Sequence, residues 1–431
     1  MTEPDGKRNA RRGVRRLLLD PTPLRLDRDY RWLWAGQAVS GIGSQVTRLA
    51  LPYQVYVLSG STLAIAALTV FQLVPILVFS LGAGSVADAV DRRRLLLVTQ
   101  VGLMATSALL AWLALTPAPP LLALFLVAFV AAGLASIDQP ARSSAVPRLV
   151  PPERLPAAIA LGQLNFQMAS VVGPAVAGVL IATVGLAGAY TLDVVSFAAS
   201  FVGLLAIAPI APLASAARPG LAAIREGLRF ALRRRVILST FVIDLDAMIF
   251  GMPTSLFPVL ALDVFHAGPT GLGLLGAAPA VGALLGALLS GWVSSVRRVG
   301  LAVIVAVAIW GVAIALFGLS TFSFALALVF LAVAGAADVL SAVFRSTIVQ
   351  LTTPDELRGR VSSIHILVVT SGPRFGDIEA AAAAAVIGAQ ASVVSGGVLC
   401  VFGVAVVARL FPELGRHVHE PATQTPVVSS A

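Results

Sequence analysis

The sequence predicts an all-α integral membrane protein with twelve transmembrane helices in two six-helix halves related by pseudo-symmetry. Three observations lead to this fold class. Of the 431 residues, 58% are hydrophobic and 12% are charged, and the mean hydropathy is +0.92, whereas about a quarter of the residues of a soluble domain are charged. Apolar segments long enough to cross a bilayer recur along the chain. A short charged motif of the first half also recurs in the second half.

Twelve segments have the length and composition of membrane spans. A transmembrane helix needs roughly 20 mostly apolar residues, because it crosses about 30 Å of hydrocarbon at about 1.5 Å per residue. The spans are expected over residues 32–58, 62–87, 95–115, 120–137, 157–183, 186–210, 236–262, 270–293, 301–318, 321–344, 361–388 and 390–408.

The basic residues predict how these spans are oriented. Of the 30 Lys and Arg residues, 28 fall in the two terminal tails or in every second linker, and the opposite linkers contain none. Because basic loops near span ends stay in the cytoplasm, we expect a multi-pass protein of the cell membrane with both termini cytoplasmic. This topology explains the net charge of +9 without nucleic-acid binding. The basic tail is expected to contact anionic membrane lipid.

An internal repeat predicts the domain organisation. The segment ARSSAVPRLVPPERL matches FRSTIVQLTTPDELRGR at an offset of 203 residues, so that Arg142 pairs with Arg345, both in expected cytoplasmic segments. Transporters are commonly built from such repeats around a midplane site. We expect an N-terminal tail, a six-helix bundle, a linker with an interfacial amphipathic helix, a second bundle and a C-terminal tail, over residues 1–31, 32–210, 211–235, 236–408 and 409–431.

Residues 84–96, GSVADAVDRRRLL, concentrate charge between two apolar spans. They resemble the loop motif between spans 2 and 3 of the major facilitator superfamily, with Gly84, Asp88, Arg92 and Arg93 at matching positions, although two neighbouring positions depart from it. An Asp at a helix end can pair with a neighbouring helix N-terminus or an arginine, and such a pair can break when one side opens. The resemblance implies the major facilitator fold and a cytoplasmic gate. A plain positive-inside loop is the alternative, but it does not explain Gly84 or Asp88.

Span 5 contains SVVGPAVAGVL, with Gly173, Pro174 and Gly178. This segment resembles the glycine-proline motif of superfamily antiporters. Proline removes an intrahelical hydrogen bond and glycine permits close helix approach, so the segment predicts a pliable contact with a neighbouring span. Ordinary helix packing is the alternative, whereas the resemblance favours export over import.

Three stretches are similar to the enterobactin-exporter branch of the same superfamily: RDYRWLWAGQAVSGIGSQ, STLAIAALTVFQLVP and TPDELRGRVSSIHILVVTSGPRFGDIEAAAAAAVIG. In the last of these, Gly376 and Asp377 match that branch. The resemblance implies a secondary active transporter that exports a small amphipathic molecule, such as a siderophore or a drug, in exchange for protons and by alternating access. An importer or a non-transporting sensor of the same fold is the alternative.

Acidic residues inside the spans are candidates for proton coupling, because ionisable groups in the membrane are costly and often functional. We expect this role for Asp377 or Glu379 in span 11 and then for Asp244 in span 7, since a carboxylate that meets both sides of the membrane in turn can carry a proton. Asp244 could instead pair with arginines of the preceding linker. Asp193 and Asp338 are expected to accept hydrogen bonds from neighbouring helices.

Polar residues on the spans predict a substrate cavity. The candidates are Gln37, Gln45, Arg48, Gln72, Asn165 and Arg374. Arg48 lies near the middle of span 1, where it could contact an anionic substrate or an acid. Arg374 is three residues from Asp377, a spacing that lets the two side chains pair on one helix face.

No group of residues in the sequence predicts an enzyme, a metal centre or a cofactor site. One cysteine, Cys400, and four scattered histidines have no zinc-ligand spacing, and no nucleophile motif is present. A channel is disfavoured because a two-fold repeat with scattered buried acids suits alternating access. The expected partners are a small-molecule substrate, protons and membrane lipid, acting on a monomer.

Overall fold

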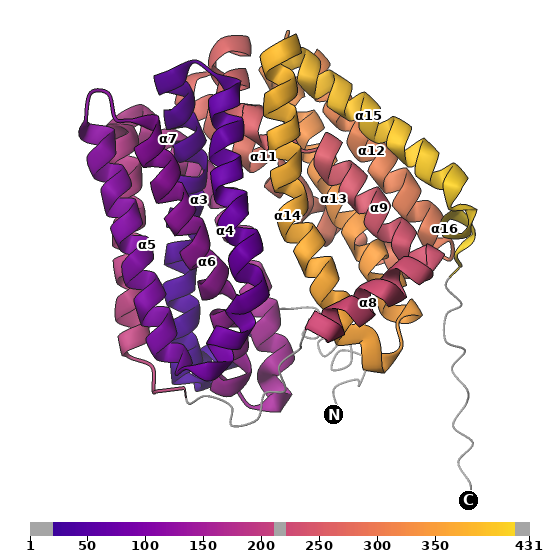
Figure 1. Cartoon of the computed structure of the whole chain (residues 1–431), viewed down its shortest axis with the longest axis horizontal. Coiled ribbons are helices and arrows are strands. Elements are labelled where there is room, and N and C mark those ends of the chain that lie inside the picture. Colours follow the sequence, from indigo (N-terminus) through magenta and orange to yellow (C-terminus); the bar gives the residue numbers. More distant parts are fainter. Residues whose placement is uncertain (1–19, 211–220, 419–431) are drawn as a thin grey trace, which may run out of the picture. The chain divides into compact units, whose positions relative to one another are not determined.

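The computed structural model describes residues 20–210 and 221–418, except for the side chains of residues 80–89, 221–225, 227, 294, 355, 356, 363 and 366. The regular structure of these residues is helical (Figure 1). Their contacts divide them into two compact units. The first unit contains the chain up to Leu51 and from Val74 to Ile210, and the second contains the segment Pro52–Leu73 and the residues from Leu221 onward.

The first unit is a bundle of long helices. It holds α2 (Thr22–Leu26), most of α3 (Arg28–Ser59) and α4 (Thr62–Ala89), α5 (Arg92–Leu115), α6 (Leu121–Leu149), the turn η1 (Pro152–Arg154) and α7 (Leu155–Leu205). Two aromatic residues fasten the start of α3 to α7. The Tyr30 hydroxyl donates a hydrogen bond to the Ala158 carbonyl at 2.7 Å, and the Trp34 indole donates to the Leu161 carbonyl at 2.9 Å.

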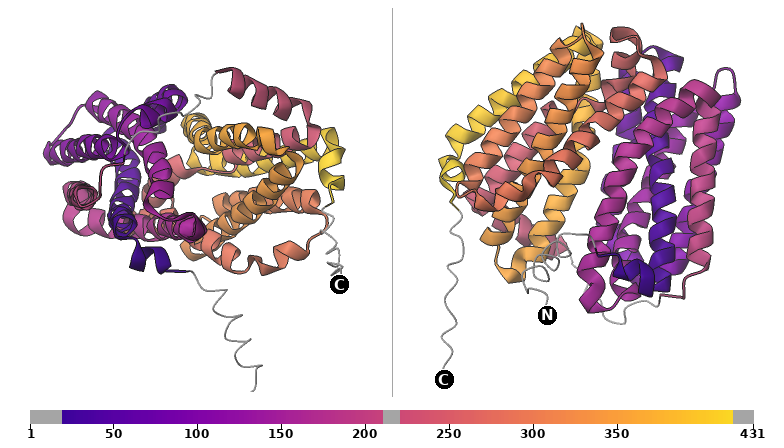
Figure 2. Two further views of the ribbon diagram at one scale, coloured as in Figure 1. Left: turned by 90° about the horizontal axis from the view of Figure 1, so that it is seen from below. Right: turned by 180° about the vertical axis from the view of Figure 1, so that it is seen from behind.

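The second unit is a bundle preceded by the predicted linker helix. Its main helices are α8 (Leu221–Arg233), α9 (Arg235–Phe250), α11 (Gly268–Leu288), the turn η4 (Ser290–Ser295), α12 (Val299–Leu319), α13 (Phe324–Thr352), α14 (Asp355–Ile387), α15 (Ala389–Leu410) and α16 (Pro412–Arg416). The linker helix α8 packs against α14, where Glu226 and Arg360 form an ion pair at 2.6 Å. Figure 2 shows the helices of each unit running alongside one another.

Within the described ranges, nine helical segments are long and apolar enough to cross a membrane. One of them, residues 152–205, contains the predicted span 157–183 and most of the span 186–210. α3 and α14 have 32 and 33 residues and coincide with predicted spans 1 and 11, but they carry more polar residues and are not among the nine. The all-α membrane fold is confirmed, and the count of twelve spans stays a prediction.

Two glycines with a left-handed backbone separate consecutive spans at equivalent positions. Gly185 has φ 75° and interrupts α7, and Gly388 has φ 84° and separates α14 from α15. The two are 203 residues apart, which is the offset of the sequence repeat. Residues with a Cβ rarely adopt this φ. The same interruption is therefore built into each half, where the sequence predicts a boundary between spans.

The predicted span 236–262 is not one continuous helix. α9 ends at Phe250, and three short helical pieces follow: η2 (Thr254–Leu256), α10 (Phe257–Val259) and the wider π-type turn η3 (Leu260–Val264). Gly251 and Pro253 lie at the break. Proline has no backbone N–H to continue the ladder, so the helix stops here and its exposed backbone groups need other partners.

Two helices continue beyond their predicted ends. Spans 4 and 10 were expected to end at residues 137 and 344, but α6 continues to Leu149 and α13 to Thr352. Arg142 and Arg345, which we expected in linkers, therefore lie inside helices and are 5% and 2% exposed. The sequence prediction was wrong here because an arginine within a helix has the same composition signal as one in a loop, and only its partners distinguish the two.

A close helix contact recurs in both units. In the first unit, Gly173 of α7 lies so near Gln45 of α3 that an added Cβ would overlap the Gln45 side chain. In the second unit, Gly376 of α14 lies in the same way against the Met248 backbone of α9. Gly376 is 203 residues after Gly173, and Met248 is 203 residues after Gln45. The absence of a side chain thus lets the helices approach closely at equivalent places.

We expect Gly376→Ala to lower the free energy of unfolding by about 1–3 kcal/mol, because the added methyl group would displace the backbone at Met248. Gly162→Ala is the matched control, since open space surrounds that glycine of α7 and alanine has the higher helix propensity. Thermal unfolding of the purified variants in detergent measures the difference. Equal melting temperatures for both variants would contradict the close contact.

Candidate functional site

A buried ion pair joins α9 to α13 in the second unit. Asp244 Oδ1 lies 2.8 Å from Arg345 Nη2, and the two side chains are 0% and 2% exposed. A second carboxylate, that of Asp338, lies 4.0 Å from the same nitrogen and is 32% exposed. Buried charges are tolerated when they are paired. Here one guanidinium faces two acids, so it offsets their charge only in part.

The hydrogen bonding of this pair is incomplete. Arg345 Nη1 donates to the Ser341 hydroxyl, one helical turn earlier, at 2.9 Å. Asp244 Oδ1 is close to the guanidinium but lacks the alignment of a hydrogen bond, and within the described part of the chain neither Asp244 Oδ2 nor Arg345 Nε has a partner. Buried polar atoms without partners are uncommon. The pair therefore keeps acceptor capacity that a proton or ligand can fill.

His365 on α14 is the residue of this cluster that sequence reasoning missed. Its ring stacks on Phe241 of α9 with centroids 5.9 Å apart, and it lies near enough to Asp244 and Arg345 for their charges to act on it. Among the described side chains and backbone, its buried Nδ1 has no hydrogen-bond partner. No sequence spacing indicates this arrangement, because its neighbours belong to other helices.

The equivalent arginine of the first unit is neutralised differently. Arg142 Nε donates to Asp138 Oδ2 on its own helix at 2.5 Å. Thr99 and Gln100 of α5 donate to Asp138 Oδ1 at 2.6 and 3.2 Å. Asp138 holds the position that Ser341 has in the second unit. Arg142 therefore pairs with a carboxylate of its own helix, α6, whereas Arg345 pairs with a carboxylate of another helix, α9.

Asp377 accepts hydrogen bonds from residues in the helix break that follows α9. Its Oδ1 accepts hydrogen bonds from the Ser255 backbone N–H at 2.8 Å and from the Thr254 hydroxyl at 2.5 Å. The carboxylate thus supplies an acceptor to backbone that the broken helix leaves without one. Asp377 and Arg374 form no ion pair in the described residues, and Arg374 instead donates to Gln72 Oε1 at 2.6 Å, within the second unit.

The remaining predicted polar residues do not gather at one place. Glu379 is half-buried on α14 and has no hydrogen-bond or ion-pair partner among residues 20–210 and 221–418. Gln37 is half-buried on α3, and Arg48 is exposed on the same helix.

Gln45 and Asn165 are both engaged between α3 and α7. The Gln45 amide donates to the Ser170 hydroxyl at 3.0 Å, and the Asn165 amide donates to the Trp34 carbonyl at 3.2 Å. Their side chains therefore contribute to helix packing in this structure.

The predicted antiporter-like motif is buried. Gly173, Pro174 and Gly178 all lie in the interior of the first unit on α7. The close approach of Gly173 to Gln45 accounts for the requirement for glycine at that position.

The predicted gate motif lies partly outside the described side chains. Those of Gly84 and Asp88 on α4 are among the residues left out. Arg92 is 1% exposed, and its Nε donates to the Ser144 hydroxyl of α6 at 3.0 Å. This arginine is therefore buried in the bundle rather than in a solvated loop.

Arg93 of the motif and the adjacent Asp91 provide hydrogen bonds to the ends of two helices. Arg93 donates to the carbonyls of Leu204 and Leu205 at 2.9 and 2.8 Å, where α7 ends. Asp91 accepts a hydrogen bond from the Arg94 backbone N–H at 3.0 Å and caps the start of α5. An aspartate at this position is favourable because it satisfies a free N–H of the first turn.

Two further acids, the buried Asp193 and the half-buried Asp246, lie on non-equivalent helices of the two units. As expected, Asp193 of α7 accepts hydrogen bonds from neighbouring hydroxyls, those of Thr47, Ser107 and Ser196 at 2.6, 2.8 and 3.2 Å. It lies against Gly43 of α3. In the second unit the acid is Asp246, on α9 at the position equivalent to Gly43.

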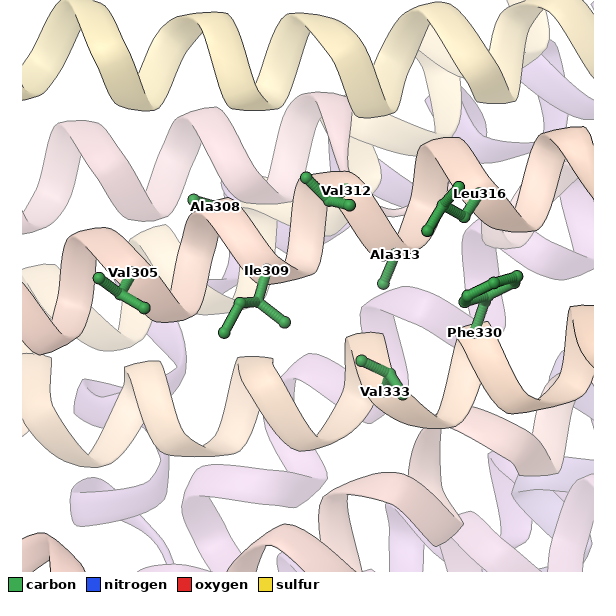
Figure 3. Close-up of a pocket in the computed structure, with 8 residues that line it drawn as sticks. All are labelled: Val305, Ala308, Ile309, Val312, Ala313, Leu316, Phe330 and Val333. Carbon is green, nitrogen blue, oxygen red and sulfur yellow. The ribbon is translucent and has the colours of Figure 1, made fainter.

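An apolar groove of about 340 Å³ runs along α12 and α13 (Figure 3). It is lined by Val305, Ala308, Ile309, Val312, Ala313, Leu316, Phe330 and Val333. This lining offers no hydrogen-bond partner to a polar substrate, and none of the predicted site residues belongs to it. In the described residues, no group of three or more His, Cys, Asp or Glu side chains could hold a metal ion.

Residues 21–427 match the family of transmembrane secretion effectors. The chain belongs to this family of the major facilitator superfamily. It is also 28% identical over 403 residues to the enterobactin exporter EntS of Citrobacter koseri, a match that covers 91% of this chain and 93% of that protein. The enterobactin exporter EntS of Escherichia coli is 27% identical over 369 residues, with 83% and 86% covered.

Solved transporter structures share the fold of this secretion-effector family member. A POT family transporter in complex with 5-aminolevulinic acid has a TM-score of 0.74 at 12% identity, covering 90% of this chain and 97% of that one. A bacterial homologue of the iron transporter ferroportin has a TM-score of 0.68 at 18% identity, covering 90% and 99%. By its family and its named relatives, the chain is a multi-pass membrane transporter and not an enzyme.

We expect Asp377→Ala to lower the free energy of unfolding by about 1–3 kcal/mol, because the Ser255 N–H and the Thr254 hydroxyl would lose their acceptor. Asp377→Asn keeps one acceptor oxygen and is expected to cost less. Glu379→Ala is the control on the same helix, with an expected change within about 0.5 kcal/mol. Thermal unfolding in detergent compares the three, and equal losses for the two alanine variants would contradict the role assigned to Asp377.

Proposed function

We propose that this transporter exports a small amphipathic molecule from the cytoplasm in exchange for protons, and that the molecule is a catecholate siderophore of the enterobactin type. The direction and the substrate class are supported by the similarity to named enterobactin exporters along 83–91% of the chain. Proton exchange is supported best by Asp244, an acid with 0% exposure in α9 whose Oδ2 has no partner in the described residues.

Among the three acids proposed for coupling, Asp244 is favoured over Asp377 and Glu379. Asp377 is occupied by two hydrogen bonds that stabilise the break after α9, so its protonation would disturb the helix rather than respond to transport. Glu379 is only half-buried. Asp244 has an arginine partner on another helix, so that its protonation changes a contact between helices.

Alternating access is proposed as the transport cycle. The recurrence of close glycine contacts in the two units, at Gly173 and Gly376, supports two similar bundles that move with little internal change. The motif of Gly84, Asp88, Arg92 and Arg93 is proposed as the cytoplasmic gate. The positive charges at every second linker support a cell-membrane protein with both termini in the cytoplasm, acting as a monomer in contact with lipid.

The residues proposed to contact the substrate are, in the first unit, Gln37, Gln45, Arg48 and Asn165 and, in the second unit, Gln72 and Arg374. Arg374 and Gln72 form a hydrogen-bonded pair that carries one positive charge. A guanidinium is well suited to an ionised catecholate, because it offers several donors to paired oxygens.

Everted membrane vesicles test this proposal, since export then delivers substrate into the lumen. Enterobactin should accumulate in vesicles that contain the protein when the lumen is acidified, and a protonophore should abolish the accumulation. Vesicles without the protein and vesicles with Asp244→Asn are the comparisons, and the variant is expected to lose the accumulation that depends on the proton gradient. Accumulation only in right-side-out vesicles would indicate import, and gradient-independent accumulation would exclude proton exchange.

A further inference from the structure

Three ionisable residues around Arg345 are specific to the second half of the chain. The repeat offset of 203 residues pairs each with a small residue of the first half: Asp244 with Gly41, Asp338 with Ala135, and His365 with Gly162. Only the arginine has an ionisable counterpart, Arg142. The first half therefore shows how an arginine at this position is accommodated without those three ionisable residues.

In the first half, one acid on the same helix is enough to pair with the buried arginine. Arg142 pairs with Asp138 at 2.5 Å, one turn away, and Thr99 also donates to that acid. In the second half the position of Asp138 holds the neutral Ser341. The negative charge comes instead from two acids, one of them on another helix, and an imidazole stands beside them. Packing does not require this larger cluster.

The charge of the cluster is not balanced. Two carboxylates and one guanidinium have a net charge of −1 while His365 is neutral, and an excess charge in a low-dielectric interior is costly. The charged groups that act on Asp244 are Arg345 and His365, and those that act on Asp338 are Arg345 and Asp244. The helices α8, α12, α15 and α16 also pack against α9, and none of their described residues is among the charged groups that act on Asp244 or Asp338. Binding of one proton would remove the excess.

The cluster is closed at one end and accessible at the other. Asp244 is 0% exposed, whereas 32% of the Asp338 side chain remains accessible. Asp338 lies midway between the ends of α13 at Phe324 and Thr352. Acids at this depth almost always face a bundle interior or a water-filled cavity. A proton that arrives from water therefore meets Asp338 before it meets Asp244.

We propose that Asp244, Asp338, Arg345 and His365 form a proton-binding site that holds one proton on either carboxylate, with His365 as a third group that exchanges it. The proton adds to a carboxylate oxygen and leaves the same oxygen to water or to an imidazole nitrogen, so no other reactant is needed. The role of this site in export rests on the proposed function, but its binding of a proton does not.

The proton would control the contact between α9 and α13. Protonation of Asp244 removes the charge that attracts Arg345 across 2.8 Å, and the guanidinium then keeps Ser341 and Asp338 on its own helix. Loss of the proton restores the bond between the helices. A contact with two discrete arrangements of this kind can couple ion binding to helix movement.

Infrared spectroscopy of the purified full-length protein tests the site without a substrate. The band of a protonated carboxyl should rise and fall as pH is varied between about 4 and 9, a range that covers the ordinary carboxyl and imidazole pKa values. Asp244→Asn or Asp338→Asn should remove or shift this band. His365→Gln should move its midpoint, and Arg345→Lys, which keeps the charge, should retain it.

Asp138→Asn is the matched control, because Asp138 pairs with the equivalent arginine in the first unit. Its band should be unchanged, with folding of each variant checked by size-exclusion chromatography. A band that survives in both cluster asparagine variants, or that responds to Na⁺ rather than to pH, would overturn the proposal. If the band behaves as expected while everted vesicles move no enterobactin, the proton site stands and the proposed export function fails.

Discussion

Hydrocarbon neither donates nor accepts hydrogen bonds, so each polar group that this chain carries into the membrane must find its partner within the chain. The broken span after α9 depends on this constraint, since Asp377 accepts the N–H that the break exposes. The same constraint determines where arginines can be buried. Arg93 donates hydrogen bonds to the free carbonyls at the end of α7, and the buried Arg345 of α13 forms an ion pair with Asp244 of α9.

The two halves share their backbone but not their chemistry. Breaks at Gly185 and Gly388 and close contacts at Gly173 and Gly376 recur at one offset, because backbone geometry tolerates little change in either half. Charge is distributed unequally, since the ionisable cluster around Arg345 belongs to the second half alone. The proposed proton site therefore falls in the second bundle, at positions where the first bundle has small residues.

Local signals in the sequence predict the helical membrane fold, the repeat and the boundaries between spans near residues 185 and 388, because hydropathy is a property of short segments. The ends of α6 and α13 could not be predicted, since Arg142 and Arg345 have the composition of loop residues until their partners are known. The partners in the candidate site depend on helix packing. Asp244 was expected to pair with the preceding linker if it had a structural role, and it meets α13 instead.

The placement of Asp193 and Asp246 on non-equivalent helices has a consequence for how such chains diverge. Asp193 is accommodated because Gly43 has no side chain, and Asp246 lies against Gly403 in the same manner. Each carboxyl and the recess that receives it form a complementary pair on two helices. A substitution that fills one recess is compatible only with the loss of its acid, so positions 43 and 193 should vary together among relatives, as should positions 246 and 403.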